Sequence, residues 1–90
     1  MTGLALGYLP EIKQVHFVIS ELIKAKAKHP EFPENPAETG MIIAEEKAEL
    51  DCAFDQFCKA VNDRKTKDHL REEAAHVAVT AIRFLEMLEK

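Results

Sequence analysis

The chain has 90 residues and a mass of 10.2 kDa, with 47% hydrophobic and 31% charged residues and no Trp. This length leaves no room for two domains, so residues 1–90 are expected to form one domain. The 16 acidic residues outnumber the 12 basic ones and give a net charge of -4. That balance excludes the basic surface with which proteins bind duplex nucleic acid or an anionic membrane.

Targeting signals and disulfide bonds are not expected. No apolar run approaches the roughly 20 residues of a membrane span, and the stretch from Leu4 to Leu9 lacks the length and basic flank of a signal peptide. Cys52 and Cys58 fall on one expected helix, about 9 Å apart along its axis, so they cannot pair with each other. Both are interpreted as small hydrophobic side chains. The chain is therefore predicted to be cytoplasmic.

Three segments with helical periodicity, and none with the alternation of a strand, predict an all-α fold. The first helix is expected to start near Pro10, a residue suited to a first turn, and to stop at His29–Pro30. Its apolar stripe consists of Ile12, Val15, Ile19, Leu22 and Ile23.

A stiff loop follows, because Pro30–Pro36 contains three prolines. The second helix is expected from roughly Thr39 to Val61. Its apolar residues recur at the spacing of one helix face. They are Ile43, Leu50, Ala53, Phe54, Phe57 and Val61.

The polar segment Asn62–Lys67 predicts a short break, after which Thr66 or Asp68 is expected to cap a third helix that ends at Leu88. Short connections make neighbouring helices antiparallel, so a helical bundle is predicted. The main apolar stripe of the third helix consists of Leu70, Ala74, Val77, Ala81, Phe84, Leu85 and Leu88.

A homo-oligomer, either a dimer or a tetramer, is expected to complete this bundle. A chain of this size buries only about 60–65% of the surface that its unfolded form exposes. Val79 and Ile82 also lie outside the main stripe of the third helix. A chain of 90 residues has too little interior to hide every such face.

Carboxylates interrupt the apolar face of the second helix. Glu46 lies within the stripe and Glu49 on its flank, three residues later. A carboxylate at such a place is costly to bury unless it is paired or holds a metal ion. Glu-x-x-Glu spacing also occurs on solvated helices, so position rather than spacing makes the pair a candidate site.

The third helix carries a matching polar edge of His69, Glu73, His76, Thr80 and Arg83. In an antiparallel pair, Glu46 and Glu49 would face Glu73 and His76, and a set rich in oxygen suits Mg²⁺ or Mn²⁺. Two alternatives stay open. His69, Glu73 and His76 are candidate ligands of Zn²⁺, and the same side chains also suit simple ion pairs or a solvated edge.

The segments Pro30–Leu50 and Leu70–Glu86 resemble the MazG-like all-α nucleoside triphosphate pyrophosphohydrolases. Members of that superfamily carry Glu-x-x-Glu on one helix and Glu-x-x-Asp on the next, and these acids hold Mg²⁺. Glu46, Glu49 and Glu73 match the first three acids, whereas His76 replaces the Asp. The resemblance implies hydrolysis of a (deoxy)nucleoside triphosphate to the monophosphate and pyrophosphate.

The resemblance also implies roles for further residues. Glu45 or Glu46 would orient the attacking water, and Arg83, Lys65 and Lys67 would contact phosphates. Phe32 or Phe17 would form an apolar wall of the base pocket. Members of the superfamily assemble as dimers or tetramers whose sites are lined by more than one chain.

A second hypothesis from another class is a catalytically silent helical module, in which the carboxylates form ion pairs and the apolar faces serve assembly. A DNA-binding adaptor is disfavoured by the acidic charge. A titration with Mg²⁺ or Mn²⁺, followed by an assay of pyrophosphate release, separates the first two hypotheses.

Overall fold

The computed structural model describes residues 9–90, which form three helices: α2 (Glu11–Lys28), α3 (Pro36–Lys59) and α4 (Arg64–Leu88). Residues 9–90 contain no strand, so the all-α prediction is confirmed. Of the Leu4–Leu9 stretch, only Leu9 falls among the described residues. None of the helices within residues 9–90 is long and apolar enough to cross a membrane.

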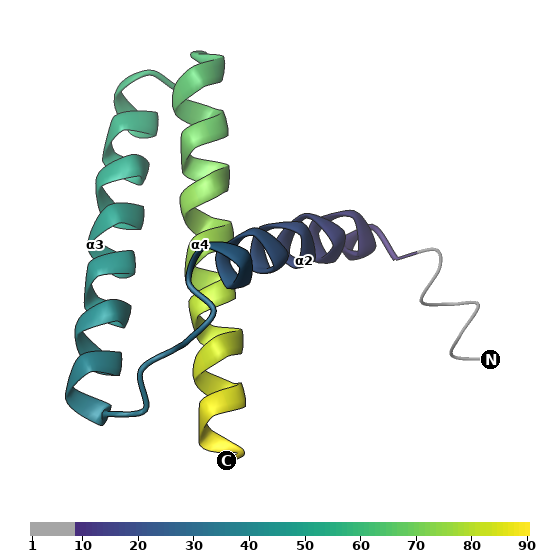
Figure 1. Ribbon diagram of the computed structural model, residues 1–90. Helices are drawn as coiled ribbons and strands as arrows, with labels where there is room; N and C mark the ends of the chain where they lie inside the picture. Colours follow the sequence, from purple (N-terminus) through teal and green to yellow (C-terminus); the bar gives the residue numbers. More distant parts are fainter. Residues whose placement is uncertain (1–8) are drawn as a thin grey trace.

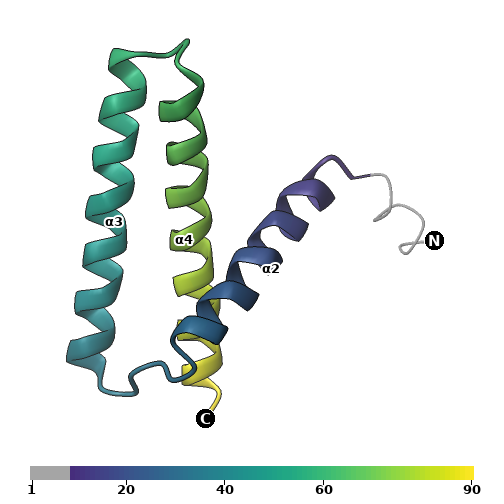
Figure 2. The ribbon, with the colours of Figure 1, turned by 45° about the horizontal axis from the view of Figure 1, so that its top comes forward.

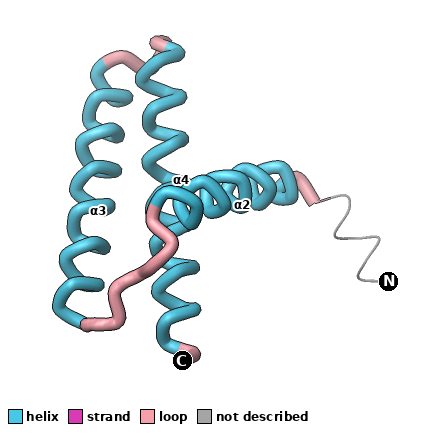
Figure 3. Tube along the Cα trace, in the orientation of Figure 1, coloured by secondary structure: helices cyan, strands magenta, loops and turns pink. Residues whose placement is uncertain are grey.

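Helices α3 and α4 form an antiparallel hairpin, as the short connection predicted (Figure 1). Helix α2 packs against α4 on one side of this hairpin, and its N-terminal half extends beyond it (Figures 1 and 2). In Figure 3 the Pro-rich loop runs from the end of α2 to the start of α3. The arrangement leaves the other side of the hairpin without a covering helix among the described residues.

Two contacts hold α2 along α4. The guanidinium of Arg71 lies 3.8 Å from the centre of the Phe17 ring, a cation–π contact. Nearer the end of α2, the Lys26 ammonium lies 3.1 Å from a Glu86 carboxylate oxygen. Helix α2 ends at Lys28, directly before the predicted His29–Pro30 stop.

Helix α3 begins at Pro36, three residues before its predicted start at Thr39. The Asn35 side chain caps the helix by accepting a hydrogen bond of 2.8 Å from the Ala37 N–H. Proline fits the first helical position, so Pro36 opens the helix and does not belong to the loop. Thr39, only 1% exposed, lies inside the first turn, and its hydroxyl contacts the carbonyl oxygens of Pro33 and Asn35, each at 3.1 Å.

Helix α4 also begins earlier than predicted. Asp63 is its cap and accepts a hydrogen bond of 3.3 Å from the Thr66 N–H, whereas Thr66 or Asp68 was the predicted cap. The Thr66 hydroxyl lies 3.1 Å from the Ala60 carbonyl oxygen, which closes the turn after α3. Lys65 and Lys67 therefore belong to the first turn of α4 and not to a loop.

The core is made of small side chains: the buried hydrophobic residues are Ala53, Ala75 and Val79. Val79 is 5% exposed and Ile82 is half-buried, so part of the apolar surface outside the predicted stripe is covered within the chain. The reason is that α4 has two apolar sectors, and the small side chains of the second let α2 pack closely. In the main predicted stripe of α4, Ala74, Ala81, Leu85 and Leu88 are exposed, and Leu70, Val77 and Phe84 are half-buried.

Large apolar side chains remain exposed on every helix, and both cysteines are exposed and unpaired. The predicted stripes of the first and second helices are thus only partly covered. The second helix ends at Lys59, two residues before its predicted end at Val61. The exposed members with the largest side chains are Val15, Ile19 and Ile23 on α2, Ile43 and Phe54 on α3, Val61 in the turn after α3, and Leu85 and Leu88 on α4.

Candidate metal centre

Glu46 of α3 meets Glu73 and His76 of α4 across the helix pair. Each residue offers one ligand atom, and the three atoms all lie within 4.8 Å of one another. Glu73 and His76 are three residues apart, which places them on neighbouring positions of one helix face. The antiparallel packing predicted from the sequence brings these three side chains together.

Two carboxylate oxygens in this cluster are buried without a hydrogen-bond partner: Oε2 of Glu46 and Oε2 of Glu73. Glu73 is only 9% exposed. Its Oε2 lies 3.6 Å from Nδ1 of His76, which is too long for a hydrogen bond. Buried carboxylate oxygens without partners are costly, and a bound cation is one way to satisfy them.

The charges around the cluster also favour a bound cation. Burial raises the pKa of the Glu46 carboxyl above its ordinary value, and the negative charge of Glu49 raises the pKa further. His76 lowers the same pKa, whereas the charges of Glu73 and Glu45 raise it. The carboxylates therefore repel one another, and a divalent cation between them would replace repulsion by attraction.

Glu49 and His69 are not part of the three-residue cluster. Glu49 is exposed, although its charge acts on Glu46. His69 is exposed as well and contributes no ligand atom to the cluster. The zinc set of His69, Glu73 and His76 is therefore not assembled within residues 9–90.

The donor set fits a small divalent cation. Two carboxylates supply negative charge and oxygen ligands, which suit Mg²⁺ and Mn²⁺. The imidazole of His76 adds a nitrogen donor, which Mn²⁺ accepts more readily than Mg²⁺ does. Three protein ligands leave coordination positions for water or for the oxygens of a substrate.

A cavity of about 810 Å³ adjoins the cluster. Its acidic wall contains Glu45, Glu46 and His76, from α3 and α4. Its basic residues are Lys24 and Lys28 of α2 and Arg83 of α4, and the carboxylates of Glu21 and Glu31 line the cavity as well. This volume lies within the usual range of small-molecule sites, and the two walls suit a ligand that carries both a cation and an anionic group.

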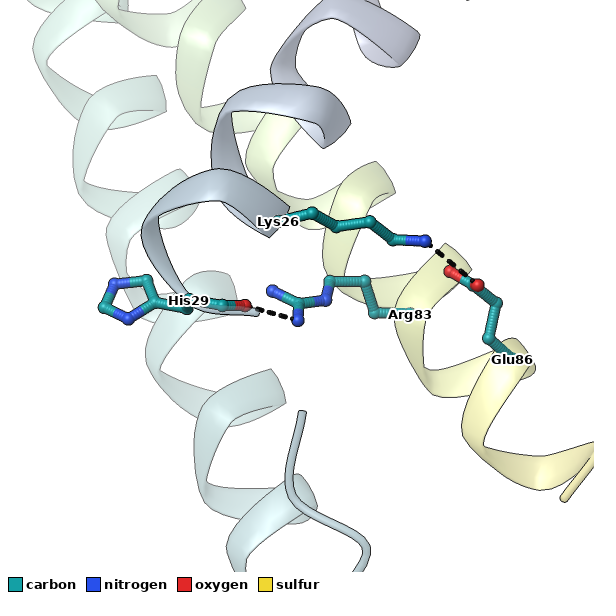
Figure 4. Close-up of polar contacts among 4 residues, drawn as sticks. All are labelled: Lys26, His29, Arg83 and Glu86. Carbon is teal, nitrogen blue, oxygen red and sulfur yellow. Dashed lines mark hydrogen bonds and ion pairs between the residues drawn. The ribbon is translucent and has the colours of Figure 1, made fainter. Parts of the chain in front are cut away.

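Arg83 is fixed at the edge of this cavity. It is 8% exposed, and its guanidinium donates a hydrogen bond of 2.6 Å to the carbonyl oxygen of His29 (Figure 4). The guanidinium also lies 5.2 Å from the centre of the Phe32 ring. Because Phe32 lines the same cavity, Arg83 joins the end of α2 to the Pro-rich loop at the site.

Of the other residues predicted to contact substrate, the structure places only some at the cavity. Phe32 lines the cavity, whereas Phe17 lies against Arg71 and does not. Lys65 and Lys67 do not line the cavity. They lie in the first turn of α4, and Lys67 precedes Glu73 by about 9 Å along the helix axis.

Lys24 and Lys28 were not identified as site residues from the sequence. Their spacing of four residues places both on one face of α2. Basic residues near the C-terminus of a helix are common, because they interact favourably with its dipole. Only the packing of α2 beside α3 and α4 distinguishes these lysines from ordinary residues of a helix end.

Comparison of the chain with protein families, with curated proteins and with solved structures finds no match.

Proposed function

We propose that the chain hydrolyses a (deoxy)nucleoside triphosphate to the monophosphate and pyrophosphate, with Mg²⁺ or Mn²⁺ held by Glu46, Glu73 and His76. The observation that carries this proposal is the pair of buried carboxylate oxygens without partners, on Glu46 and Glu73, beside a cavity that basic residues also line. The resemblance of residues 30–50 and 70–86 to the MazG-like superfamily supplies the reaction class.

The reaction requires a water molecule to attack the α-phosphorus. A new bond forms from the water oxygen to phosphorus, and the bond from phosphorus to the bridging oxygen breaks, so that its electron pair leaves with pyrophosphate. Bound metal would supply a Lewis acid for the phosphate oxygens and for the charge on the leaving group. Glu45 lines the cavity next to Glu46 and is exposed, so its carboxylate is free to accept the proton of the water.

Basic side chains on the opposite wall would hold the phosphates. Arg83 is held in place by its hydrogen bond to His29, which leaves other N–H groups for an anion. Lys24 and Lys28 add two ammonium groups from α2. Phe32 offers an aromatic face for stacking with a nucleobase. Glu49, at the exposed edge of the cluster, would bind a second cation or a water of the first.

The test is an assay of pyrophosphate release from a panel of ribo- and deoxyribonucleoside triphosphates, with Mg²⁺, with Mn²⁺ and with a chelator. We expect metal-dependent release that Glu45→Gln reduces at least about 100-fold in kcat without changing metal affinity. Glu72→Gln is the matched control, because Glu72 is exposed and lies outside the cluster. Absence of release from every nucleotide with either metal would contradict the proposal.

A catalytically silent helical module is the second candidate function. The exposed apolar side chains on all three helices favour it, because such surfaces serve assembly. In that case Glu73 and His76 form only the ion pair that their 3.6 Å separation permits. The silent module predicts that Mn²⁺ neither binds nor stabilises the chain.

A further inference from the structure

The threonines of residues 9–90 use their hydroxyl groups in two different ways. The hydroxyls of Thr39 and Thr66 each contact two main-chain carbonyl oxygens, at 3.0 or 3.1 Å. Thr80 of α4 is only 9% exposed, yet its hydroxyl makes no hydrogen bond with any other part of residues 9–90. A threonine within a helix can bond to the carbonyl oxygen four residues earlier, as Thr39 does. Thr80 therefore keeps its hydroxyl available at a buried position.

The space that reaches this hydroxyl is the cavity of about 810 Å³ beside the cluster. Thr80 lines that cavity and is the one lining residue with a hydroxyl, next to the apolar side chains of Ile42 and Val79. Within residues 9–90, the fully enclosed oxygens without a partner belong to Glu46 and Glu73 and not to Thr80. A molecule in the cavity can therefore contact the Thr80 hydroxyl, which then gains the partner that the chain does not supply.

Thr80 belongs to a row of polar side chains along one face of α4. Glu73, His76, Thr80 and Arg83 follow one another at intervals of three, four and three residues, which places them on neighbouring positions of that face. Thr80 comes about 6 Å after His76 and about 4.5 Å before Arg83 along the helix axis. Its hydroxyl thus lies between the candidate metal cluster and the guanidinium.

Both ends of this row suit phosphate. A cation at the cluster would bind phosphate oxygens, and the guanidinium of Arg83 forms charged hydrogen bonds with the same group. The two positions are about 10 Å apart along the axis. A chain of phosphates carries acceptor oxygens along its whole length, so it offers one at the intermediate position. The sugar and the base of a nucleotide lie beyond the end of that chain and not between two of its phosphates.

We infer that the Thr80 hydroxyl donates a hydrogen bond to a phosphate oxygen of the bound triphosphate, between the oxygens bound by the cation and those bound by Arg83. The inference rests on the proposed function for its ligand, a triphosphate bound together with a divalent cation, but it does not depend on hydrolysis. A hydrogen bond to a charged acceptor is stronger than one between neutral groups. Thr80 is thus a binding residue and not a structural one.

The test uses the manganese complex of inorganic triphosphate, which has neither sugar nor base, as the titrant in calorimetry. Thr80→Val keeps the shape of the side chain and removes the hydroxyl, so the dissociation constant should rise at least about tenfold. Thr80→Ser retains the hydroxyl and should bind within about threefold of the wild type. The affinity for Mn²⁺ alone should be the same in all three chains, because Thr80 is not part of the cluster.

Thr66→Val is the matched control, since it makes the same change on the same helix at a residue that does not line the cavity. It should leave the binding of inorganic triphosphate unchanged and lower the Tm, because the contacts of its hydroxyl are lost. Thr80→Val should show the reverse: weaker binding and, without ligand, a Tm equal to or above that of the wild type. A hydroxyl with a purely structural role would lower the Tm instead.

Equal dissociation constants of the wild type and Thr80→Val for inorganic triphosphate would overturn the inference. A loss of affinity for nucleoside triphosphates alone would overturn it as well, because the hydroxyl would then bind the sugar or the base. Binding that depends on Thr80 without release of pyrophosphate would contradict the proposed hydrolysis and leave this inference standing. Thr80→Ala removes the same hydroxyl and gives the same comparison if Thr80→Val does not fold.

Discussion

The buried negative charge of Glu46 lowers the stability of the fold, and either protonation or a bound cation would remove this cost. Its Oε2 is buried without a partner, and Glu49, Glu73 and Glu45 raise its pKa together with burial. A group with a raised pKa binds more protons in the folded chain than in the unfolded one. Without metal, stability therefore falls as the pH rises through the window that begins at the ordinary value of 4.5 and ends above the raised pKa.

Glu46→Gln should therefore stabilise the chain in the absence of metal. The amide keeps the shape of the side chain and removes its charge, so we expect a gain of about 1 kcal/mol at pH 7, or about 4–8 °C in Tm. Below the pH window the gain should vanish, because wild-type Glu46 is then protonated. Thermal unfolding in a chelator at several pH values measures both effects, and lower stability of the variant at pH 7 would contradict them.

In the proposed metal site, His76 is the residue that would distinguish Mn²⁺ from Mg²⁺. A carboxylate at this position adds negative charge and a second oxygen, so His76→Asp should tighten Mg²⁺ binding about tenfold. Calorimetry of the two chains at the same fixed pH provides the measurement. Equal Mg²⁺ affinity of the two chains would exclude His76 as a ligand.

At the scale of the elements, α2 completes the cavity. It contributes Lys24 and Lys28 and, through His29, positions Arg83. The pair His29–Pro30 predicted where α2 ends, because a proline acts locally by restricting the backbone of the residue before it. Periodicity did not predict which side of α4 the helix covers, because α4 offers two apolar sectors and the choice depends on how closely side chains pack.

Lys28→Ala should raise KM for the triphosphate about tenfold, because a charged hydrogen bond to phosphate is lost. Lys24→Ala should have a smaller effect, since Lys24 is 70% exposed and already lies 3.5 Å from Glu21. Lys65→Ala is the control and should leave KM unchanged. Steady-state kinetics with saturating metal measures KM for each variant. A larger increase of KM with Lys65→Ala than with Lys28→Ala would show that the first turn of α4 binds the phosphates.

The start of α3 depends on Thr39, whose hydroxyl contacts the Pro33 and Asn35 carbonyl oxygens. Thr39→Val keeps the volume and removes these contacts at a buried position, so we expect a loss of about 1–2 kcal/mol in the free energy of unfolding. Thr39→Ser should retain most of the stability. Urea unfolding of the three chains tests this, and equal midpoints for Thr39→Val and wild type would show that the hydroxyl contributes nothing.

At the scale of the whole molecule, the sequence predicted the helices and their antiparallel pairing more reliably than the buried surface. Glu46, Glu73 and His76 were predicted to meet because their spacing on two neighbouring helices is a local property. The buried face of α4 was predicted incorrectly, because Leu70, Leu85 and Leu88 are the larger side chains. Their size favours burial, but α2 packs on the other sector, where the small side chains of Ala75 and Val79 allow close approach.

The exposed apolar residues of the hairpin and the candidate metal site are separate in the molecule. Phe54 of α3 and Leu85 and Leu88 of α4 are exposed and do not line the cavity beside the cluster. Substitutions at these exposed residues are therefore expected to leave metal binding unchanged, whereas substitutions in the cluster should alter it.

Calorimetric titration of the wild-type chain and of Glu73→Gln with Mn²⁺ tests the metal centre most directly. Glu73 is the most deeply buried ligand of the cluster, so we predict saturable binding to the wild type, an affinity at least about tenfold weaker for Glu73→Gln and an unchanged affinity for Glu72→Gln. Equal Mn²⁺ binding by wild type and Glu73→Gln, or no binding by any of the three chains, would contradict a metal site at this cluster.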